Sequence, residues 1–143
     1  DLRFVTLKIC DTYGKDDTRP KIMALFKRIS ETEETLAMSP GDQLLDILYI
    51  NDVISGFIQL ILLLDSNELS NDEYILRAEK RYSLKELASI FSHINNKDLN
   101  IVWGGRPYRE REVMIPWAKG ILVPGWKPAI DIETGIKQFL DKL

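Results

Sequence analysis

The sequence predicts one mixed domain of strands and helices, in either an α/β or an α+β arrangement. Short β-rich apolar runs alternate with helical apolar stripes along the 143 residues, of which 45% are hydrophobic. No internal repeat or linker divides the chain. A chain of this length can bury a single core but is too short for two full domains.

The first half of the chain predicts two strands, each followed by a helix. Residues 5–10 form a β-rich run that ends at the polar turn 11–14, and Pro20 fits the first turn of a helix capped by Thr18. The apolar stripe of this helix is Ile22, Leu25, Phe26 and Ile29. Residues 47–50 predict a buried strand. A helix over 53–64, capped by Asn51 or Asp52, follows, and because all its faces are apolar we expect it at the centre of the core.

The second half predicts two strands and two capped helices. Residues 74–76 and 99–103 form the strands, and residues 104–112 form a loop with three arginines. Ser83 and Glu86 have the spacing of a capping box, and Asp131 caps a terminal helix. The apolar stripes of the two helices are Leu84, Leu87, Ala88, Phe91 and Ile94, and Ile132, Ile136, Phe139, Leu140 and Leu143.

Composition excludes several classes of partner. Nineteen basic against 22 acidic side chains give a net charge of −3, so we expect no nucleic-acid partner and no anionic membrane surface. One cysteine and one histidine are too few for a zinc site, so no metal ligand is assigned. The apolar run 53–64 is too short to span a bilayer, and no signal-peptide pattern opens the chain. A cytoplasmic location is therefore expected.

Catalytic and cofactor-binding motifs are absent from the sequence. The eight glycines form neither a dinucleotide-binding turn nor a P-loop, and no tyrosine is followed by a lysine four residues later. The chain also begins at Asp1 with a strand entered almost at once, which leads us to expect a fragment of a longer protein. Taken alone, the residues indicate an α/β domain without catalytic apparatus.

Three ordered segments carry a resemblance to a known family. They are Asp11-Thr12-Tyr13-Gly14 followed by Arg19-Pro20, the segment 41–53 with its Asp-x-x-Tyr-x-x-Asp-Val ending, and Gly125-Trp126-Lys127-Pro128 followed by 131–135. Together they resemble the C-terminal half of the NAD-dependent epimerase/dehydratase family, the extended short-chain dehydrogenases that act on nucleotide sugars. The family's arginine before Asp46 is Leu45 here.

This resemblance implies the fold and the partners. The fold would be α/β: a late strand and loop of the nucleotide-binding Rossmann sheet over residues 1–14, and a substrate-binding domain over 15–143 with a small mixed sheet and helices. NAD or NADP would bind a missing N-terminal Rossmann domain, so the fragment alone would hold no cofactor, contain no catalytic residue and be inactive. The full-length protein would be a homodimer.

The resemblance also implies a substrate class. Asp-Thr-Tyr-Gly and the segment 106–112 look most like family members that handle CDP-linked 3,6-dideoxyhexoses of the abequose, paratose and tyvelose type. A nucleotide-diphosphate sugar, with CDP favoured, is therefore the expected ligand, and the implied pathway is O-antigen synthesis for lipopolysaccharide. The alternative left open is a free-standing, non-catalytic module that binds nucleotide sugars or a protein.

Seven residues are candidates for the site. Arg109 aligns with a phosphate-binding arginine of the family, and arginine suits a diphosphate because its planar fork donates two hydrogen bonds. Arg111 is its neighbour. The other substrate-binding candidates are Gln43, Lys21, Thr12 and Tyr13, and Asp11 is the cofactor-binding candidate. Against these stand plainer interpretations: residues 109–112 as a solvated charge run, 11–13 as a polar turn, and Lys21 and Gln43 as surface residues.

Overall fold

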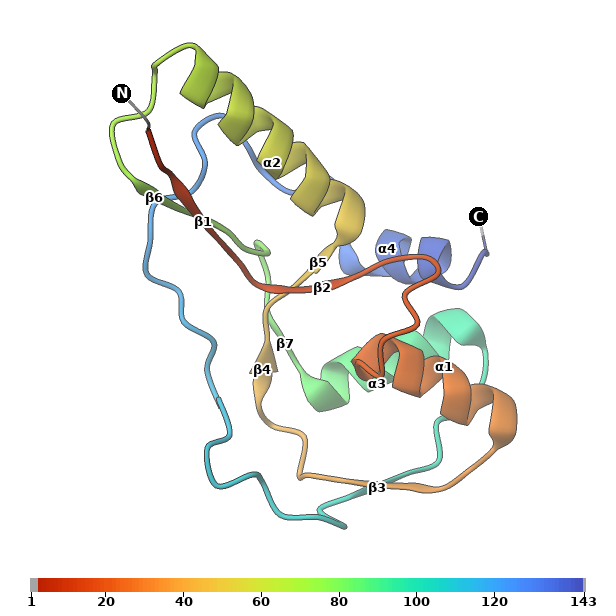
Figure 1. Ribbon diagram of the computed structural model, residues 1–143. Coiled ribbons are helices and arrows are strands. Elements are labelled where there is room, and N and C mark those ends of the chain that lie inside the picture. The colour runs from red at the N-terminus through yellow and green to blue at the C-terminus, as the bar shows by residue number, and fades with distance from the viewer. Residues whose placement is uncertain (1–2, 143) are drawn as a thin grey trace.

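Parallel strand pairs dominate the computed structural model, which describes residues 3–142 (Figure 1). The parallel pairs are β1 (Thr6–Ile9) with β6 (Glu73–Leu76), β2 (Asp11–Tyr13) with β5 (Ile47–Tyr49), and β3 (Leu36–Met38) with β8 (Ile101–Trp103). The antiparallel pair is β4 (Leu44–Leu45) with β7 (Tyr82–Ser83). The helices are α1 (Ile22–Thr32), α2 (Ile50–Asp65), α3 (Leu84–Asn95) and α4 (Ile132–Phe139). The α/β prediction is confirmed.

Two apolar clusters share the interior, and β5 forms the wall between them. All three residues of β5 are buried; Leu48 packs into one cluster, whereas Ile47 and Tyr49 pack into the other. Successive side chains of a strand point to opposite faces, which is why one short strand serves both clusters. The sheet cluster consists of Leu48, Val53, Leu60, Leu69, Tyr74, Leu76, Val123 and Trp126. The helical cluster joins α1, α3 and α4.

Several segments that come after residue 14, the expected end of the sheet portion, pack with β1 in the sheet cluster. Strand β6 pairs with β1, Leu122 forms a further parallel bridge to Ile75, and α2 lies alongside these strands (Figure 1). The helix can approach the sheet closely because Gly56 has no side chain. A Cβ at this position would come within 2.6 Å of the Leu76 side chain. The segment after β8 then runs back from the helical part to the sheet (Figure 1).

Two of the predicted helix starts are confirmed and two are corrected. Ser83 and Glu86 form the full capping box of α3, and Asp131 caps α4 by accepting the Thr134 N–H. Thr18 caps nothing, because the Asp17 carboxylate holds the backbone and side chain of Arg19 in a preceding turn and α1 begins after Lys21. Helix α2 likewise begins earlier than predicted, at Ile50, with Tyr49 in the cap position.

Asp52 therefore lies inside α2, where its carboxylate binds a distant segment of backbone instead of capping the helix. It is 3% exposed and accepts hydrogen bonds from the backbone N–H groups of Ala129 and Ile130, both at 3.0 Å. The Asp52 carbonyl accepts a third bond from the Trp126 indole N–H at 3.1 Å. These bonds tie the segment before α4 to the start of α2.

Other differences from the sequence prediction concern exposure and strand length. Helix α2 is not central: its outward side is exposed at Ile54, Phe57, Ile58, Ile61 and Leu62. Residues 11–13 form strand β2 rather than a turn, and the short strands β3, β4 and β7 were not predicted. Strands of two or three residues are too short to show a hydrophobic period. Leu143 lies outside the described residues, and within them no helix has the length and hydrophobicity needed to cross a membrane.

The bonds of Asp52 predict a large stability effect. Asp52→Ala would leave two N–H groups without their acceptor, which costs roughly 2–4 kcal/mol of the free energy of unfolding. Urea unfolding at neutral pH measures this loss. Asp65→Ala, at the exposed end of the same helix, is the matched control and should change stability by less than about 0.5 kcal/mol. Equal effects of the two substitutions would contradict the anchoring role of Asp52.

Candidate functional site

A cavity of about 740 Å³ opens where β3 and β8 end beside the starts of α1 and α3. Carboxyl ends of parallel strands meet at one edge of a sheet, and ligands of α/β proteins bind at such edges. The cavity is lined by Asp11, Pro20, Lys21, Ile22, Leu25, Met38, Ser39, Gln43, Leu45, Leu84, Arg106, Pro107, Tyr108, Arg109 and Glu112. Its walls are thus apolar toward the helices, while its charged groups come from the loop after β8 and from segments around Asp11 and Lys21.

Arg106 and Arg109, both on the 104–112 loop, line this cavity, and their guanidinium groups have no partner among the described residues. Neither Arg106 nor Arg109 forms a side-chain hydrogen bond or ion pair with any residue in the range 3–142. The backbone N–H of Arg106 donates to the Met38 carbonyl at 3.1 Å, which fixes the loop against the end of β3. Both arginines are therefore positioned by the backbone while their cationic ends stay available to an anion.

Tyr108 holds the same loop from the other side. Its hydroxyl donates to the Asp42 carboxylate at 3.2 Å and accepts from the Asp42 N–H at 3.1 Å. Lys85, in the first turn of α3, donates to the same carboxylate at 3.2 Å. The Asp42 carboxylate thus accepts from Tyr108 and Lys85 and is not paired with Arg106 or Arg109.

Lys21 and Asp11 form an ion pair on the cavity wall. Lys21 is the residue before α1, and its side chain makes no capping bond. The pair places a cation and an anion together at the mouth, with both side chains partly exposed. Of the seven candidate residues, Arg109, Gln43, Lys21 and Asp11 are brought together here.

Gln43 contributes a buried neutral amide. It is 7% exposed, and its side-chain nitrogen donates to the Ser39 hydroxyl at 3.1 Å. The expectation of a simple surface turn is wrong for this residue, because β4 and the turn before it are folded into the cavity wall. An amide and a hydroxyl together offer both donors and acceptors to a polar ligand.

Tyr13, Thr12 and Arg111 do not line the cavity. Tyr13 is buried in the helical cluster, edge-on to Tyr49 with ring centroids 5.4 Å apart. A Cβ on Gly135 would collide with its hydroxyl oxygen, and burial raises the pKa of this hydroxyl above its usual range. Strand β2 runs from the cavity into the core, so only its first residue, Asp11, reaches the opening.

Arg106 is the site residue that sequence reasoning did not single out. Its signal is its position directly after the Gly104-Gly105 turn that ends β8, three residues before Arg109. Gly104 has a φ of +74°, and a Cβ on Gly105 would lie 2.9 Å from the Ala37 side chain, so the turn needs both glycines. Leu45 also lines the cavity, at the position where the family resemblance led us to look for an arginine.

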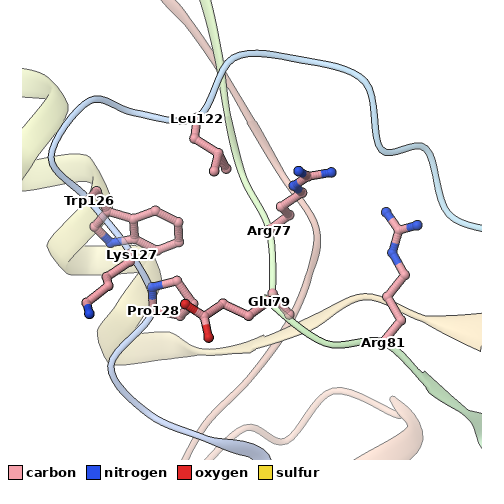
Figure 2. Close-up of a pocket in the computed structure, with 8 residues that line it drawn as sticks. Arg77, Glu79, Arg81, Leu122, Trp126, Lys127 and Pro128 are labelled. Atoms are coloured by element: carbon pink, nitrogen blue, oxygen red, sulfur yellow. The ribbon is translucent and has the colours of Figure 1, made fainter.

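A second pocket, of about 420 Å³, is also lined by three basic side chains, Arg77, Arg81 and Lys127, but is built differently (Figure 2). Figure 2 shows the guanidinium groups of Arg77 and Arg81 pointing away from Trp126 and Pro128. Arg77 donates to the Ala118 carbonyl at 2.7 Å, and Arg81 pairs with the buried Asp46 carboxylate at 3.2 Å. Arg77 and Arg81 are thus already bound to groups of the protein, so the larger cavity is the better candidate for an anionic ligand.

The described residues do not fit a dinucleotide cofactor. The residues at the N-caps of the four helices are Lys21, Tyr49, Ser83 and Asp131, and no glycine-rich turn leads into any of these helices. A pyrophosphate requires such a turn, because the backbone must approach it closely. Within residues 3–142, no group of three His, Cys, Asp or Glu side chains is placed to hold a metal ion either.

Comparison with known proteins decides the family. The profile of the NAD dependent epimerase/dehydratase family matches residues 1–74, just over half of the chain. The chain belongs to this family. CDP-abequose synthase of Yersinia pseudotuberculosis is 31% identical over 113 residues, which are 79% of this chain and 39% of that protein. CDP-abequose synthase of Salmonella muenchen is 25% identical over 142 residues, 98% of this chain and 48% of that protein.

Solved structures of the family share the fold. UDP-glucose 4-epimerase of Stenotrophomonas maltophila, with NAD and formylated UDP-arabinopyranose bound, matches 99% of this chain with a TM-score of 0.83 and 16% identity. UDP-glucose 4-epimerase of Thermotoga maritima, with UDP-glucose, matches 99% with a TM-score of 0.76 and 17% identity. The chain covers 48% and 46% of these two proteins and less than half of the two synthases.

The bonds of Tyr108 predict that it orders the arginine loop. Tyr108→Phe removes both hydrogen bonds with Asp42, and losing about 1 kcal/mol for each should speed trypsin cleavage after Arg109 and Arg111 roughly five- to thirty-fold. Mass spectrometry of the first cleavage products measures this rate. Tyr82→Phe serves as control, because the Tyr82 hydroxyl bonds to no side chain or backbone group in the described range. Unchanged cleavage in Tyr108→Phe would show that other contacts hold the loop.

Proposed function

We propose that this chain is the nucleotide-sugar-binding part of an NAD(P)-dependent epimerase, dehydratase or reductase. The observation that carries the proposal is the pair of unpartnered guanidinium groups, Arg106 and Arg109, on a cavity of about 740 Å³. Membership of the epimerase/dehydratase family and the curated relatives, which are enzymes named for a CDP-linked sugar, support it.

The charges at the cavity suit a diphosphate. A guanidinium stays ionised at every physiological pH and donates two parallel bonds to phosphate oxygens. Arg106 and Arg109, three residues apart on one anchored loop, can hold two phosphate groups, whereas the Lys21 cation on the same cavity is paired with Asp11. Leu45 lines the cavity without a charge, so the loop must supply the binding that an arginine at this position would give.

The uncharged parts of the cavity suit the two ends of a nucleotide sugar. Leu25, Met38 and Leu84 offer an apolar surface, and the Ser39–Gln43 pair offers hydrogen bonds at the same wall. A ligand with a planar base, a diphosphate and a hydroxylated ring needs all three kinds of contact. We favour a CDP-linked deoxyhexose as this ligand, with a role in O-antigen synthesis, because the matched synthases are named for CDP-abequose.

The cofactor would come from a further part of the protein. Strand β1 pairs only with β6 among the described strands, so its other edge is open, and Phe4 and Ile9 beside it are exposed. An open parallel edge accepts further strands. We propose that a Rossmann half binding NAD or NADP continues the sheet there and supplies the catalytic groups. A pocket of about 360 Å³ at the end of β1 shares Asp11 and Gln43 with the larger cavity, so Asp11 would lie between substrate and cofactor.

Arg109→Ala is the first test of this proposal. A hydrogen bond to a charged group contributes roughly 1.5–3 kcal/mol, which corresponds to a ten- to hundred-fold loss of affinity. Calorimetry with CDP-glucose on the protein expressed from its complete coding sequence should show this loss with NAD affinity unchanged. Arg109→Lys should recover only part of the affinity, because an ammonium cannot reproduce the fork.

Arg106→Ala should weaken binding to a similar extent, whereas Arg111→Ala is the matched control and should cost less than three-fold, about 0.6 kcal/mol. Arg111 carries the same charge on the same loop but does not line the cavity. Equal, small effects of all three substitutions would mean that residues 106–112 are a solvated charged face.

A separate prediction concerns the cofactor. The 143-residue chain by itself should bind no NADH in calorimetry, because it lacks a cradle for the pyrophosphate. The complete protein should bind it. Micromolar NADH affinity of the 143-residue chain would contradict the proposal that a separate Rossmann half binds the cofactor. If neither this chain nor the complete protein bound NADH, the result would favour a non-catalytic module.

A further inference from the structure

Gln43 carries hydrogen-bonding groups that the described residues leave partly unused. Its side chain is 7% exposed, and its Nε2 donates one hydrogen to the Ser39 hydroxyl at 3.1 Å. Within residues 3–142, the second hydrogen on Nε2 has no acceptor. The amide oxygen Oε1 accepts only from the Ser39 hydroxyl, at 3.4 Å, which is longer than the usual range of about 2.5–3.0 Å for an O–H···O bond. These two side chains are the Ser39–Gln43 pair.

A buried amide with unused hydrogen-bonding groups is suited to a ligand. Polar groups removed from water cost free energy unless they find partners. An amide offers two donor hydrogens and an acceptor oxygen, and a hydroxyl offers one donor hydrogen and two acceptor sites. Both members of the pair line the cavity. The pair therefore matches a ligand group that donates and accepts at once, as the hydroxyl of a sugar does.

The backbone fixes the pair in place. Residues 40–42 form the turn between its two members, and Gly41 in this turn has a φ of +86°, a conformation that favours glycine. The Gln43 carbonyl accepts the Leu84 N–H at 3.1 Å, and the Gly41 carbonyl accepts the Lys85 N–H at 3.1 Å. Both bonds hold the turn against the start of α3. The pair is thus positioned before a ligand binds, which lowers the entropic cost of binding.

The pair adjoins two parts of the cavity that differ in chemistry. Ser39 directly follows Met38, which belongs to the apolar wall, and the Gln43 backbone is bonded to Leu84 of the same wall. The Met38 carbonyl also accepts the Arg106 N–H at 3.1 Å, so the arginine loop is attached beside the same residue. The Ser39–Gln43 pair therefore lies next to both the apolar wall and the loop that carries the arginines.

This arrangement matches the order of groups in a nucleoside diphosphate, and the inference rests on the proposed function. A base on the apolar wall and a diphosphate at Arg106 and Arg109 leave the ribose, which joins them, beside the polar pair. We propose that the Ser39–Gln43 pair binds the ribose hydroxyls and selects nucleotide sugars built on ribose over those built on 2′-deoxyribose. Gln43 is then a specificity-determining residue, because a ligand without the 2′-hydroxyl leaves its buried amide without a partner.

Calorimetry with CDP and dCDP on the complete protein measures this selection. The two ligands share base and diphosphate and differ only in the 2′-hydroxyl. The wild-type protein should bind CDP about ten-fold more tightly than dCDP, the effect of one buried hydrogen bond. Gln43→Leu, which replaces the amide by an apolar group of similar size, should bind CDP about as weakly as dCDP. Its affinity for dCDP should stay within about two-fold of the wild-type value.

Three further variants separate the ribose contact from other effects. Ser39→Ala is a smaller change in the same pair and should lower the preference to about three-fold, so it tests the proposal even if Gln43→Leu does not fold. Gln138→Leu makes the matched change on α4, away from the cavity, and should keep the ten-fold preference. Arg106→Ala should weaken CDP and dCDP equally, because both carry the diphosphate.

The other outcomes overturn the ribose assignment. Equal affinity of the wild-type protein for CDP and dCDP does so while leaving the proposed function intact, and so does an unchanged preference in Gln43→Leu. A Gln43→Leu variant that loses affinity for CDP-glucose but not for CDP would assign the pair to the hexose. One that changes only the preference between CDP and UDP would assign it to the base. A complete protein that binds neither CDP nor dCDP contradicts the proposed function itself and this inference with it.

Discussion

The position of the C-terminal segment depends on one buried carboxylate. Asp52 accepts the N–H groups of Ala129 and Ile130, and its own carbonyl accepts the indole N–H of Trp126. Asp52 is the third residue after β5, the strand that separates the sheet cluster from the helical cluster. The segment that it holds leads into α4, which packs against α3 and encloses Tyr13. A single side chain thus sets how the end of the chain closes the helical cluster.

A buried carboxylate is costly unless it is hydrogen-bonded, and here its place in the fold lowers that cost. Asp52 lies in the first turn of α2, where the helix dipole favours a negative charge, and two backbone donors point at it. A similar arrangement places Asp46 between the Ala78 N–H and Arg81. Both carboxylates flank β5, so the strand shared by the two clusters is clamped at each end.

The arginines of the cavity stay unpaired because nearby carboxylates accept hydrogen bonds from other donors. Three acidic groups near the arginine loop already have a donor: Asp42 accepts from Tyr108 and Lys85, Asp11 pairs with Lys21, and Glu112 accepts the Arg109 N–H. Arg106 and Arg109, which line the cavity, are therefore paired with none of these carboxylates. These two unpaired cations belong to a chain whose net charge is −3, and they make an anionic ligand the best-supported proposal.

Local residue patterns determined the features that depend on neighbours in the chain: the capping box at Ser83, the cap at Asp131, the main parallel strands, and the motifs that indicated the family. Only the tertiary structure decided which candidates meet. Tyr13 and Asp11 are two residues apart, yet one is core and the other lines the cavity, because β2 enters the helical cluster along its length. Arg106 and the exposed side of α2 also emerged only in three dimensions, since burial depends on what distant segments cover, which no local period records.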